Sequence, residues 1–167
     1  MFDRVVIGID PGMAATGLAA VAGGDGGAAG VVSATTVRTT AGMPEADRLR
    51  AVFHAVVSAV REHRPRSVAV ERLMWGRNVG SAMSVARATG VILLAAAEAG
   101  VPVFEYAPLE IKMAVTGNGN AAKSEVRRAL DRLHGVADLP TEPDAADAVA
   151  VALCHLHQSP ALREAAR

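Results

Sequence analysis

The sequence predicts one α/β domain, spanning residues 1–167, in which helices flank a five-stranded mixed sheet. Two observations lead to this prediction. Hydrophobic residues make up 51% of a chain of 167 residues, which is enough to build a well-filled core. Strand-like and helix-like segments follow one another as three strands, a helix, a strand, a helix, a strand and further helices. That order is typical of a sheet covered by helices.

The first forty residues read as strands joined by turns. Three apolar or alternating runs are the expected strands, at 5–10, 17–22 and 31–38. The glycine-rich segment 23–27 is expected to form a turn. Apolar residues then recur at helical spacing from Leu49 to Val60, and Pro65 closes this amphipathic helix.

The second half of the chain alternates strands and helices. Further strands are expected at 67–71 and 101–106. Between them, a helix of small apolar residues is expected from Ser81, its N-cap, to Ala99. Because it is apolar nearly all round, it should be central or lie in an interface. Three more helices are predicted, after Pro108, from the loop at 117–120 to about Leu133, and from Thr141 and Pro143 onward.

The composition excludes several classes of protein. A single cysteine, Cys154, excludes disulfide scaffolds and cysteine-based zinc sites, and it favours a reducing compartment. The N-terminus lacks the layout of a signal peptide, and the longest apolar stretch, 90–97, is too short to span a bilayer. We therefore expect a cytoplasmic protein without membrane contact. The net charge of zero argues mildly against a nucleic-acid partner, although acidic sites can hide local basic surface.

Four carboxylates stand where acids are normally unwelcome. Asp10 and Glu71 each end an apolar strand, and Asp144 and Asp147 open an otherwise apolar helix. Two such charges about 4 Å apart repel by roughly 4 kcal/mol at an effective dielectric constant of about 20. A bound cation makes such a cluster sensible at neutral pH, and ligands that are all oxygen favour magnesium or manganese. The pattern is typical of a nuclease.

Each acid also has an ordinary explanation. Asp10 opens an Asp-Pro-Gly turn, Glu71 can pair with Arg72, and Asp144 suits the positive end of a helix. Asp147 is harder to explain in this way, because Ala-Val-Ala-Val follows it and a buried charge needs a partner. The specificity therefore lies in the combination of two strand-end acids with a helical Asp-x-x-Asp.

Four segments in register resemble the RuvC family of Holliday junction resolvases. They are 8–12 (Gly-Ile-Asp-Pro-Gly), 69–72 (Ala-Val-Glu-Arg), 115–119 (Val-Thr-Gly-Asn-Gly) and 144–148 (Asp-Ala-Ala-Asp-Ala). The similarity extends from Val5 to about His157, and it implies a ribonuclease-H-like fold. It also implies a set of catalytic residues: the metal ligands Asp10, Glu71, Asp144 and Asp147, with Lys112 and Lys123. These two are the only lysines of the chain.

The resemblance implies a metal-dependent endonuclease that resolves four-way DNA junctions by paired symmetric nicks during recombination and repair. We expect two Mg²⁺ ions about 3.5–4 Å apart, for which Mn²⁺ would substitute. Because a four-way junction is roughly two-fold symmetric, a C2 homodimer would supply its two sites. The helices at 82–99 and 49–60 are the candidate interfaces. A branch-migration helicase complex is an expected further partner.

Several residues are candidates for DNA contact. The resembled family usually has an aromatic residue where this chain has Met74, and Trp75 lies next to it. Either Trp75 stacks on bases or Met74 acts as an apolar wedge, while the ordinary alternative for Trp75 is a half-buried core position. The remaining candidates are Arg77, Asn78, Gly117, Asn118, Gly119, Lys123 and Arg127. For the glycine segment the alternative is a flexible loop, and for the basic residues a solvated surface.

Three rival functions remain open from the sequence. A ribonuclease-H-fold nuclease acting on structured RNA or RNA–DNA hybrids would need the same acids. An actin-like nucleotide-binding lobe also uses a glycine-rich hairpin after a strand-end aspartate, although 167 residues barely make one lobe. A catalytically dead junction-binding module would not need all four acids. His155 and His157 should point in different directions on a helix, so no metal shared between them is expected.

Overall fold

A computed structural model describes residues 4–23, 29–74, 79–132 and 139–165 of the chain. The strands are β1 (Arg4–Asp10), β2 (Ala15–Gly23), β3 (Ala29–Arg38), β4 (Ser67–Glu71) and β5 (Val103–Tyr106). The helices are α1 (Glu45–His63), α2 (Val79–Glu98), α3 (Pro108–Thr116), α4 (Lys123–Arg132) and α5 (Pro143–Ala165). The order of elements is the predicted one.

The five strands form one mixed sheet in the order β3-β2-β1-β4-β5. β2 runs antiparallel to both β1 and β3, whereas β4 pairs in parallel with both β1 and β5. The predicted five-stranded mixed sheet is therefore confirmed. The parallel pairs matter for the site, because β1 and β4 end at the same edge of the sheet.

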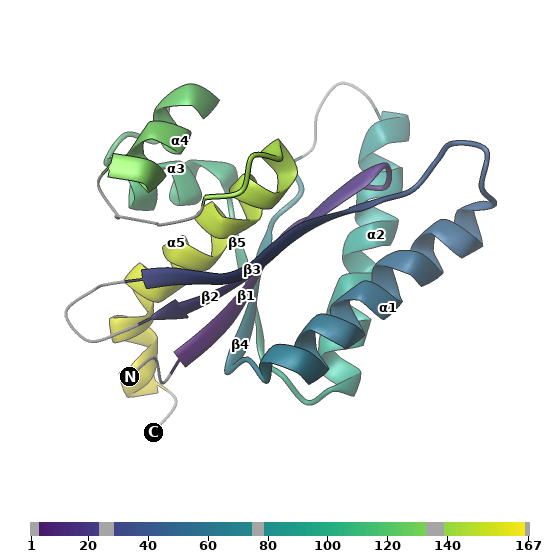
Figure 1. Cartoon of the computed structure of the whole chain (residues 1–167), viewed down its shortest axis with the longest axis horizontal. Helices are drawn as coiled ribbons and strands as arrows, with labels where there is room; N and C mark the ends of the chain where they lie inside the picture. The colour runs from purple at the N-terminus through teal and green to yellow at the C-terminus, as the bar shows by residue number, and fades with distance from the viewer. Residues whose placement is uncertain (1–3, 24–28, 75–78, 133–138, 166–167) are drawn as a thin grey trace.

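Helices cover both faces of the sheet (Figure 1). On β1 and β4, Val6 and Ala69 face α5, which lies across one side of the sheet together with α3 and α4. The intervening residues, such as Ile7 and Val68, face α1 and α2 on the other side. This alternation follows from the two-residue repeat of a strand. It assigns Asp10 and Glu71, which follow Gly8 and Ala69 by two residues, to the α5 side.

Two glycines let α5 approach the sheet closely. A Cβ atom at Gly8 would overlap the main chain of α5 at Ala148, and one at Gly17 would overlap the carbonyl group of Asp144. At the other end of the helix, Gly23 lies against the side chain of Leu156. Because Gly17 pairs with Asp10 and Gly23 with Arg4, α5 runs antiparallel to β1, with its first turn at the carboxylates.

α1 ends at His63, before Pro65 as predicted, where Arg64 adopts a left-handed conformation and donates its N–H to the Val60 carbonyl at 2.9 Å. Several other predicted boundaries were wrong. β2 and β3 each begin two residues before the predicted start. α2 begins at Val79, so Ser81 lies inside the helix and is not its N-cap. β5 begins at Val103, because the N–H of Val101 still bonds to Ala96 at the end of α2. Within the described residues, no helix combines the length and the apolarity that crossing a membrane requires.

Candidate active site

Asp10 and Glu71 lie side by side at the ends of β1 and β4. Their preceding residues, Ile9 and Val70, are paired in the parallel register, and both acids face α5. The two carboxyl groups lie within hydrogen-bonding reach of each other. A hydrogen bond between them requires a proton between two groups that are both normally ionised at neutral pH.

The pKa values of this pair show how unfavourable two bare charges would be here. Burial, followed by the negative charge of Glu71, raises the pKa of Asp10 to about 8. Burial also raises the pKa of Glu71, while its hydrogen bond with Asp10 and the positive charges of Lys123 and Lys112 oppose the increase. The metal-free pair therefore holds one proton at neutral pH, in the place where a cation would remove the need for it.

Asp147 and Lys123 bring a third acid and an ammonium group to this pair. Lys123 Nζ donates to Asp147 Oδ2 at 2.7 Å, and the Asp147 side chain is 27% exposed. The charges of both residues act on Asp10 and Glu71. The hydrogen bond that Lys123 donates to Asp147 raises the pKa of Lys123, which keeps the ammonium charged. α4 thus places one positive charge among three acids.

Asp144 occupies the first turn of α5, three residues before Asp147, so both share a helix face. Its carbonyl group lies against Gly17, and Gly17 is the strand partner of Asp10. The backbone of Asp144 is therefore level with the end of β1. Its side chain is half-buried. The structure thus brings together Asp10, Glu71 and Asp147, with the backbone of Asp144 beside them.

The donor set fits a hard divalent cation. All four candidate ligands are carboxylates, which Mg²⁺ and Mn²⁺ prefer, and the shared proton of Asp10 and Glu71 marks a point that requires positive charge. Among the residues that the structure describes, no three acidic, histidine or cysteine side chains are gathered closely enough to coordinate one ion. Binding through more than two acids therefore requires the Asp144 or Asp147 side chain to close on the strand-end pair.

A hydrogen-bond network that the sequence analysis missed holds the turn after Asp10. The Thr39 hydroxyl donates to the Met13 carbonyl, and Arg48 Nε donates to Thr39 Oγ1 at 2.8 Å. On the other side of the turn, Thr16 Oγ1 donates to the Gly12 carbonyl at 2.6 Å. Both threonines are buried. In the sequence Thr16 stands among apolar residues, but Thr39 lies between Arg38 and Thr40, so nothing there indicated this network.

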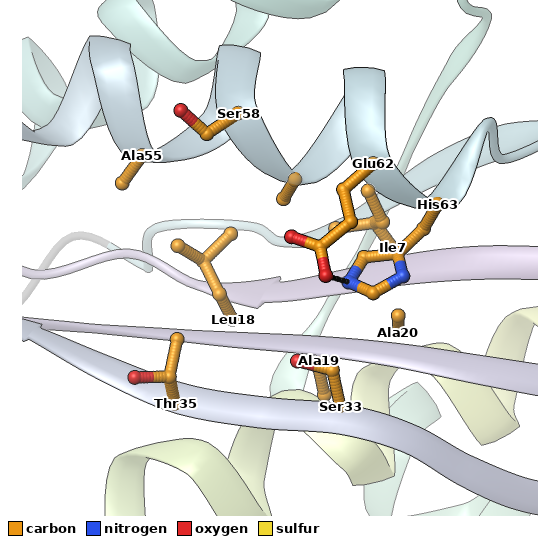
Figure 2. A pocket seen from close by; sticks show the side chains of 11 residues that line it. Ile7, Leu18, Ala19, Ala20, Ser33, Thr35, Ala55, Ser58, Glu62 and His63 are labelled. Atoms are coloured by element: carbon orange, nitrogen blue, oxygen red, sulfur yellow. Dashed lines mark ion pairs between the residues drawn. The ribbon is translucent and has the colours of Figure 1, made fainter.

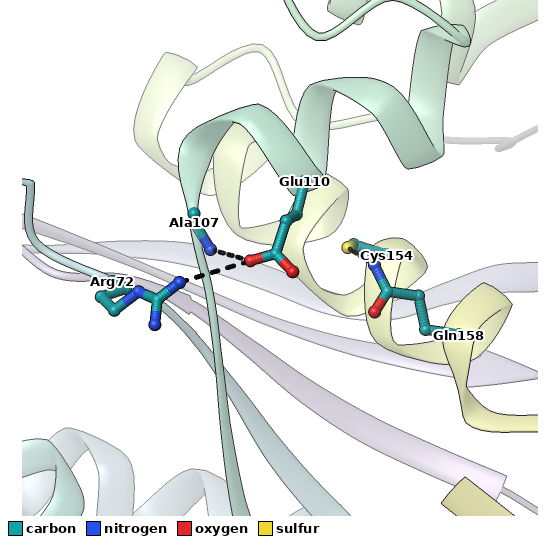
Figure 3. A network of polar contacts seen from close by, with 5 residues as sticks. All are labelled: Arg72, Ala107, Glu110, Cys154 and Gln158. Atoms are coloured by element: carbon teal, nitrogen blue, oxygen red, sulfur yellow. Dashed lines mark hydrogen bonds and ion pairs between the residues drawn. The ribbon is translucent and has the colours of Figure 1, made fainter. Parts of the chain in front are cut away.

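α3 supports the side of the site next to Glu71. Lys112 is close enough for its charge to act on Glu71. Glu110 accepts the Ala107 N–H at 2.7 Å and lies 3.5 Å from Arg72, so Arg72 pairs with α3 (Figure 3). The same view shows Cys154, a buried thiol whose pKa is raised to about 12 by burial, so it stays protonated at neutral pH.

The predicted DNA contacts fall in different environments. Met74 is 59% exposed at the end of the described segment that follows β4, as a wedge requires. Trp75, Arg77 and Asn78 lie outside the described residues. Arg127 donates to the Pro140 carbonyl at 2.9 Å, so it holds the segment leading into α5. Its expected phosphate contact stays a prediction.

The glycine segment after α3 is a hydrogen-bonded turn. Gly117 caps α3 with φ 74° and donates its N–H to Met113 at 2.9 Å. Asn118 N–H bonds to the Thr116 hydroxyl, and Asn120 N–H bonds to the Asn118 side chain, both at 3.0 Å. These amides would have to change partner to bind a phosphate. Gly119 packs on Leu109, where a Cβ would come within 2.9 Å.

A pocket on the opposite face of the sheet is separate from this site. It lies between α1 and the strands β1, β2 and β3. Figure 2 shows Glu62 and His63 among its lining residues, and Glu62 Oε1 lies 4.0 Å from His63 Nε2. Its lining contains none of the four carboxylates.

His155 and His157 were predicted to point in different directions on their helix. His155 is buried, whereas His157 is exposed. The expectation that these two histidines point apart is confirmed.

Comparisons with known proteins agree on one family. A family model described as "Crossover junction endodeoxyribonuclease RuvC" matches residues 6–155. A protein of that name from Frankia alni is 46% identical over 157 residues, covering 94% of this chain and 80% of the relative. One from Pelotomaculum thermopropionicum is 40% identical over 153 residues, covering 92% and 93%. The solved structure of T. thermophilus RuvC in complex with Holliday junction substrate matches with a TM-score of 0.87 at 36% identity, covering 93% and 94%.

Proposed function

This chain belongs to the RuvC family of crossover junction endodeoxyribonucleases, and from that premise we propose that it cuts four-way DNA junctions by paired symmetric nicks. The observation that best supports this proposal is the pair of acids at the ends of β1 and β4. Asp10 and Glu71 lie side by side there, and Asp147, bonded to Lys123, lies close enough for its charge to act on both. A nuclease that works through divalent metal needs such a group of acids at an accessible edge of the sheet. The related structure with a Holliday junction supports the substrate class.

We propose that Asp10, Glu71, Asp144 and Asp147 hold the metal, as Mg²⁺ or Mn²⁺ and as two ions. When bound, the metal would supply Lewis-acid stabilisation of the phosphate and lower the pKa of the attacking water. The chain's own residues contribute positive charge close to the metal site. The two lysines, which already act electrostatically on Glu71, would offset negative charge developing at the phosphate.

We also propose a C2 homodimer that pairs two sites on the symmetric junction. α2 is the favoured interface because it exposes Met83 (48%) and Leu94 (52%). The outer face of α1 instead carries exposed charges, including Arg50, Arg61 and Glu62. A chain that sediments as a monomer at micromolar concentration contradicts this proposal. A branch-migration helicase partner and a cytoplasmic location are proposed from the family resemblance.

One experiment tests the function against its rivals. The protein and its Asp10→Asn variant are incubated with labelled four-way junction, linear duplex of matched sequence and RNA–DNA hybrid, with and without Mg²⁺. We expect paired nicks in the junction alone, dependent on Mg²⁺ and absent from the variant, which still binds the junction. Cleavage of the hybrid would favour the rival nuclease. Binding without cleavage would favour the inactive module, and binding of ATP the nucleotide-binding lobe.

A further inference from the structure

A buried histidine lies on α5, two turns beyond the carboxylates. His155 is 5% exposed, and each of its ring nitrogens faces a hydroxyl group. Nε2 lies 2.8 Å from Ser67 Oγ, and Nδ1 lies 2.7 Å from the hydroxyl of Tyr106. A neutral imidazole offers one donor and one acceptor, so the two hydroxyls satisfy both nitrogens. Burial lowers the pKa of His155, which favours that neutral form.

The two hydroxyls come from the strands at the Glu71 side of the site. Ser67 is the first residue of β4, and Glu71 is its last. Tyr106 ends β5, where it is the register partner of Glu71, and its carbonyl accepts the N–H of Arg72 at 2.8 Å. His155 therefore ties α5 to the start of β4 and to the strand end beside Glu71.

The spacing along α5 matches the spacing along β4. Ser67 to Glu71 is four steps of a strand, about 13 Å. His155 back to Asp147 is eight steps of a helix, about 12 Å. Because α5 runs antiparallel to β1 and β4, holding His155 at Ser67 brings Asp147 level with Glu71. A slip of one helical turn, about 5.4 Å, would carry Asp147 away from the strand-end pair.

Between Asp147 and His155, the other contacts of α5 with the sheet specify this register only through apolar packing. Between Asp147 and His155 the helix is apolar, and all seven residues are buried, most of them alanine or valine. The hydrogen bonds of His155 are directional. If the helix shifts, two hydroxyls and both ring nitrogens lose their partners in the core. The histidine thus adds a register signal that the small apolar residues lack.

We propose that His155 is a positioning residue: its bonds to Ser67 and Tyr106 lock α5 in the register that brings Asp147 to Glu71, and so set the affinity of the site for divalent metal. The inference rests on the proposed metal-dependent function. It assigns His155 no contact with metal or DNA. Its effect should therefore appear in the metal affinity of the DNA-free protein as well as in cleavage.

The test compares four variants of the full chain. His155→Leu removes both bonds, Tyr106→Phe removes one and keeps the ring, and His155→Gln keeps a donor and an acceptor. Val56→Ala is the control, because Val56 is fully buried on the opposite face of the sheet. For each, the melting temperature, Mg²⁺ affinity by calorimetric titration without DNA, and the junction cleavage rate are measured.

We expect His155→Leu to weaken Mg²⁺ binding about tenfold or more, the range seen when residues supporting metal ligands are removed. Tyr106→Phe should lie between it and the wild type, and His155→Gln should recover part of the affinity. Val56→Ala should lose melting temperature while keeping its metal affinity. The proposal is overturned if His155→Leu binds Mg²⁺ like the wild type, or if Val56→Ala loses as much affinity.

Two further outcomes separate this proposal from the proposed function. If His155→Leu does not fold, Tyr106→Phe decides the question, and wild-type affinity in that variant overturns the proposal. A wild-type protein that binds Mg²⁺ but cuts no junction refutes the function alone, because the affinities of the variants still test the register. A wild-type protein that binds no Mg²⁺ overturns both.

Discussion

The main chain of Asp144 rests on Gly17, which is the strand partner of Asp10. No side chain fits between them, since a Cβ at Gly17 would overlap the Asp144 carbonyl group. The first turn of α5, which carries two of the four acids, therefore sits as close to the end of β1 as a main chain permits. The close approach is a structural requirement of the site, and the glycine that allows it is not a ligand.

Gly17→Ala is expected to lower the free energy of unfolding by about 1–3 kcal/mol, because the added methyl group overpacks the contact. By pushing α5 outward it should also reduce the cleavage rate by tenfold or more. Chemical denaturation and a junction cleavage assay measure the two effects. Gly42→Ala is the matched control, because a Cβ there meets nothing within 4 Å and Gly42 is exposed in the turn before α1, away from the proposed interface. That variant should be neutral or slightly more stable. Equal behaviour of the two variants would contradict the packing argument.

Asp10→Asn is expected to stabilise the metal-free protein at alkaline pH. The folded pKa of Asp10 is raised to about 8, whereas the unfolded value lies near 4. The contribution of this group to stability is therefore full below about pH 4 and is lost as the pH rises through about 8. Asparagine has no proton to lose. At pH 8.5 we expect a gain of about 1–3 kcal/mol over the wild type, given that nearby charges and the remaining exposure moderate the effect.

Urea denaturation with a chelator, at pH 5 and pH 8.5, measures this difference. Asp131→Asn serves as control, because Asp131 is an exposed acid of α4. The prediction concerns the change in the difference between variant and wild type, so that other titrating groups cancel. A gain that is the same at both pH values would show that Asp10 does not hold the shared proton.

The pairing of Asp10 with Glu71 requires β1 and β4 to be parallel neighbours, which no local pattern in the sequence predicted. The position of each acid at the end of a strand was predicted, because a short apolar run within one element is enough to indicate a strand. The helical spacing of Asp144 and Asp147 likewise requires only the helix repeat. Each of these predictions uses residues within one element.

The contacts that adjust the site were not predictable in this way. Lys123 bonds to Asp147 across 24 residues of sequence, and His155 bonds to Tyr106 and Ser67 across 49 and 88. No periodicity connects such pairs, because they depend on how α4 and α5 are placed over the sheet. The role of Arg127 shows the same limit, since its position on a basic helix gave no sign of the Pro140 carbonyl that it binds.

His155→Gln is expected to reduce the fall in melting temperature between pH 7 and pH 5. Burial lowers the pKa of His155 in the folded protein, so the unfolded chain takes up a proton first as the pH falls below about 6.5. The contribution of the neutral histidine is therefore present above that pH and is lost below it, by at most about 1.4 kcal/mol per pH unit. Melting temperatures at pH 7 and pH 5 test this, with His54→Gln on the exposed face of α1 as control. A control that flattens the profile equally would rule out His155 as the cause.

Lys123→Ala is expected to separate metal binding from catalysis. The Lys123 ammonium bonds to Asp147 at 2.7 Å, so a cation that binds Asp147 must compete with it. Without the lysine, Mg²⁺ affinity in the absence of DNA should rise about twofold to tenfold; the gain is modest because the lysine side chain is 81% exposed and solvent screens its charge. The cleavage rate at saturating Mg²⁺ should fall at least tenfold, because a positive charge near the phosphate is lost.

Lys123→Arg should restore the positive charge. A planar guanidinium cannot reproduce the compact contact of the ammonium group, so the cleavage rate of this variant should stay below that of the wild type. Calorimetric titration and single-turnover cleavage give the two values. If both metal affinity and rate fall together, Lys123 supports the metal site, and the competition argument is wrong.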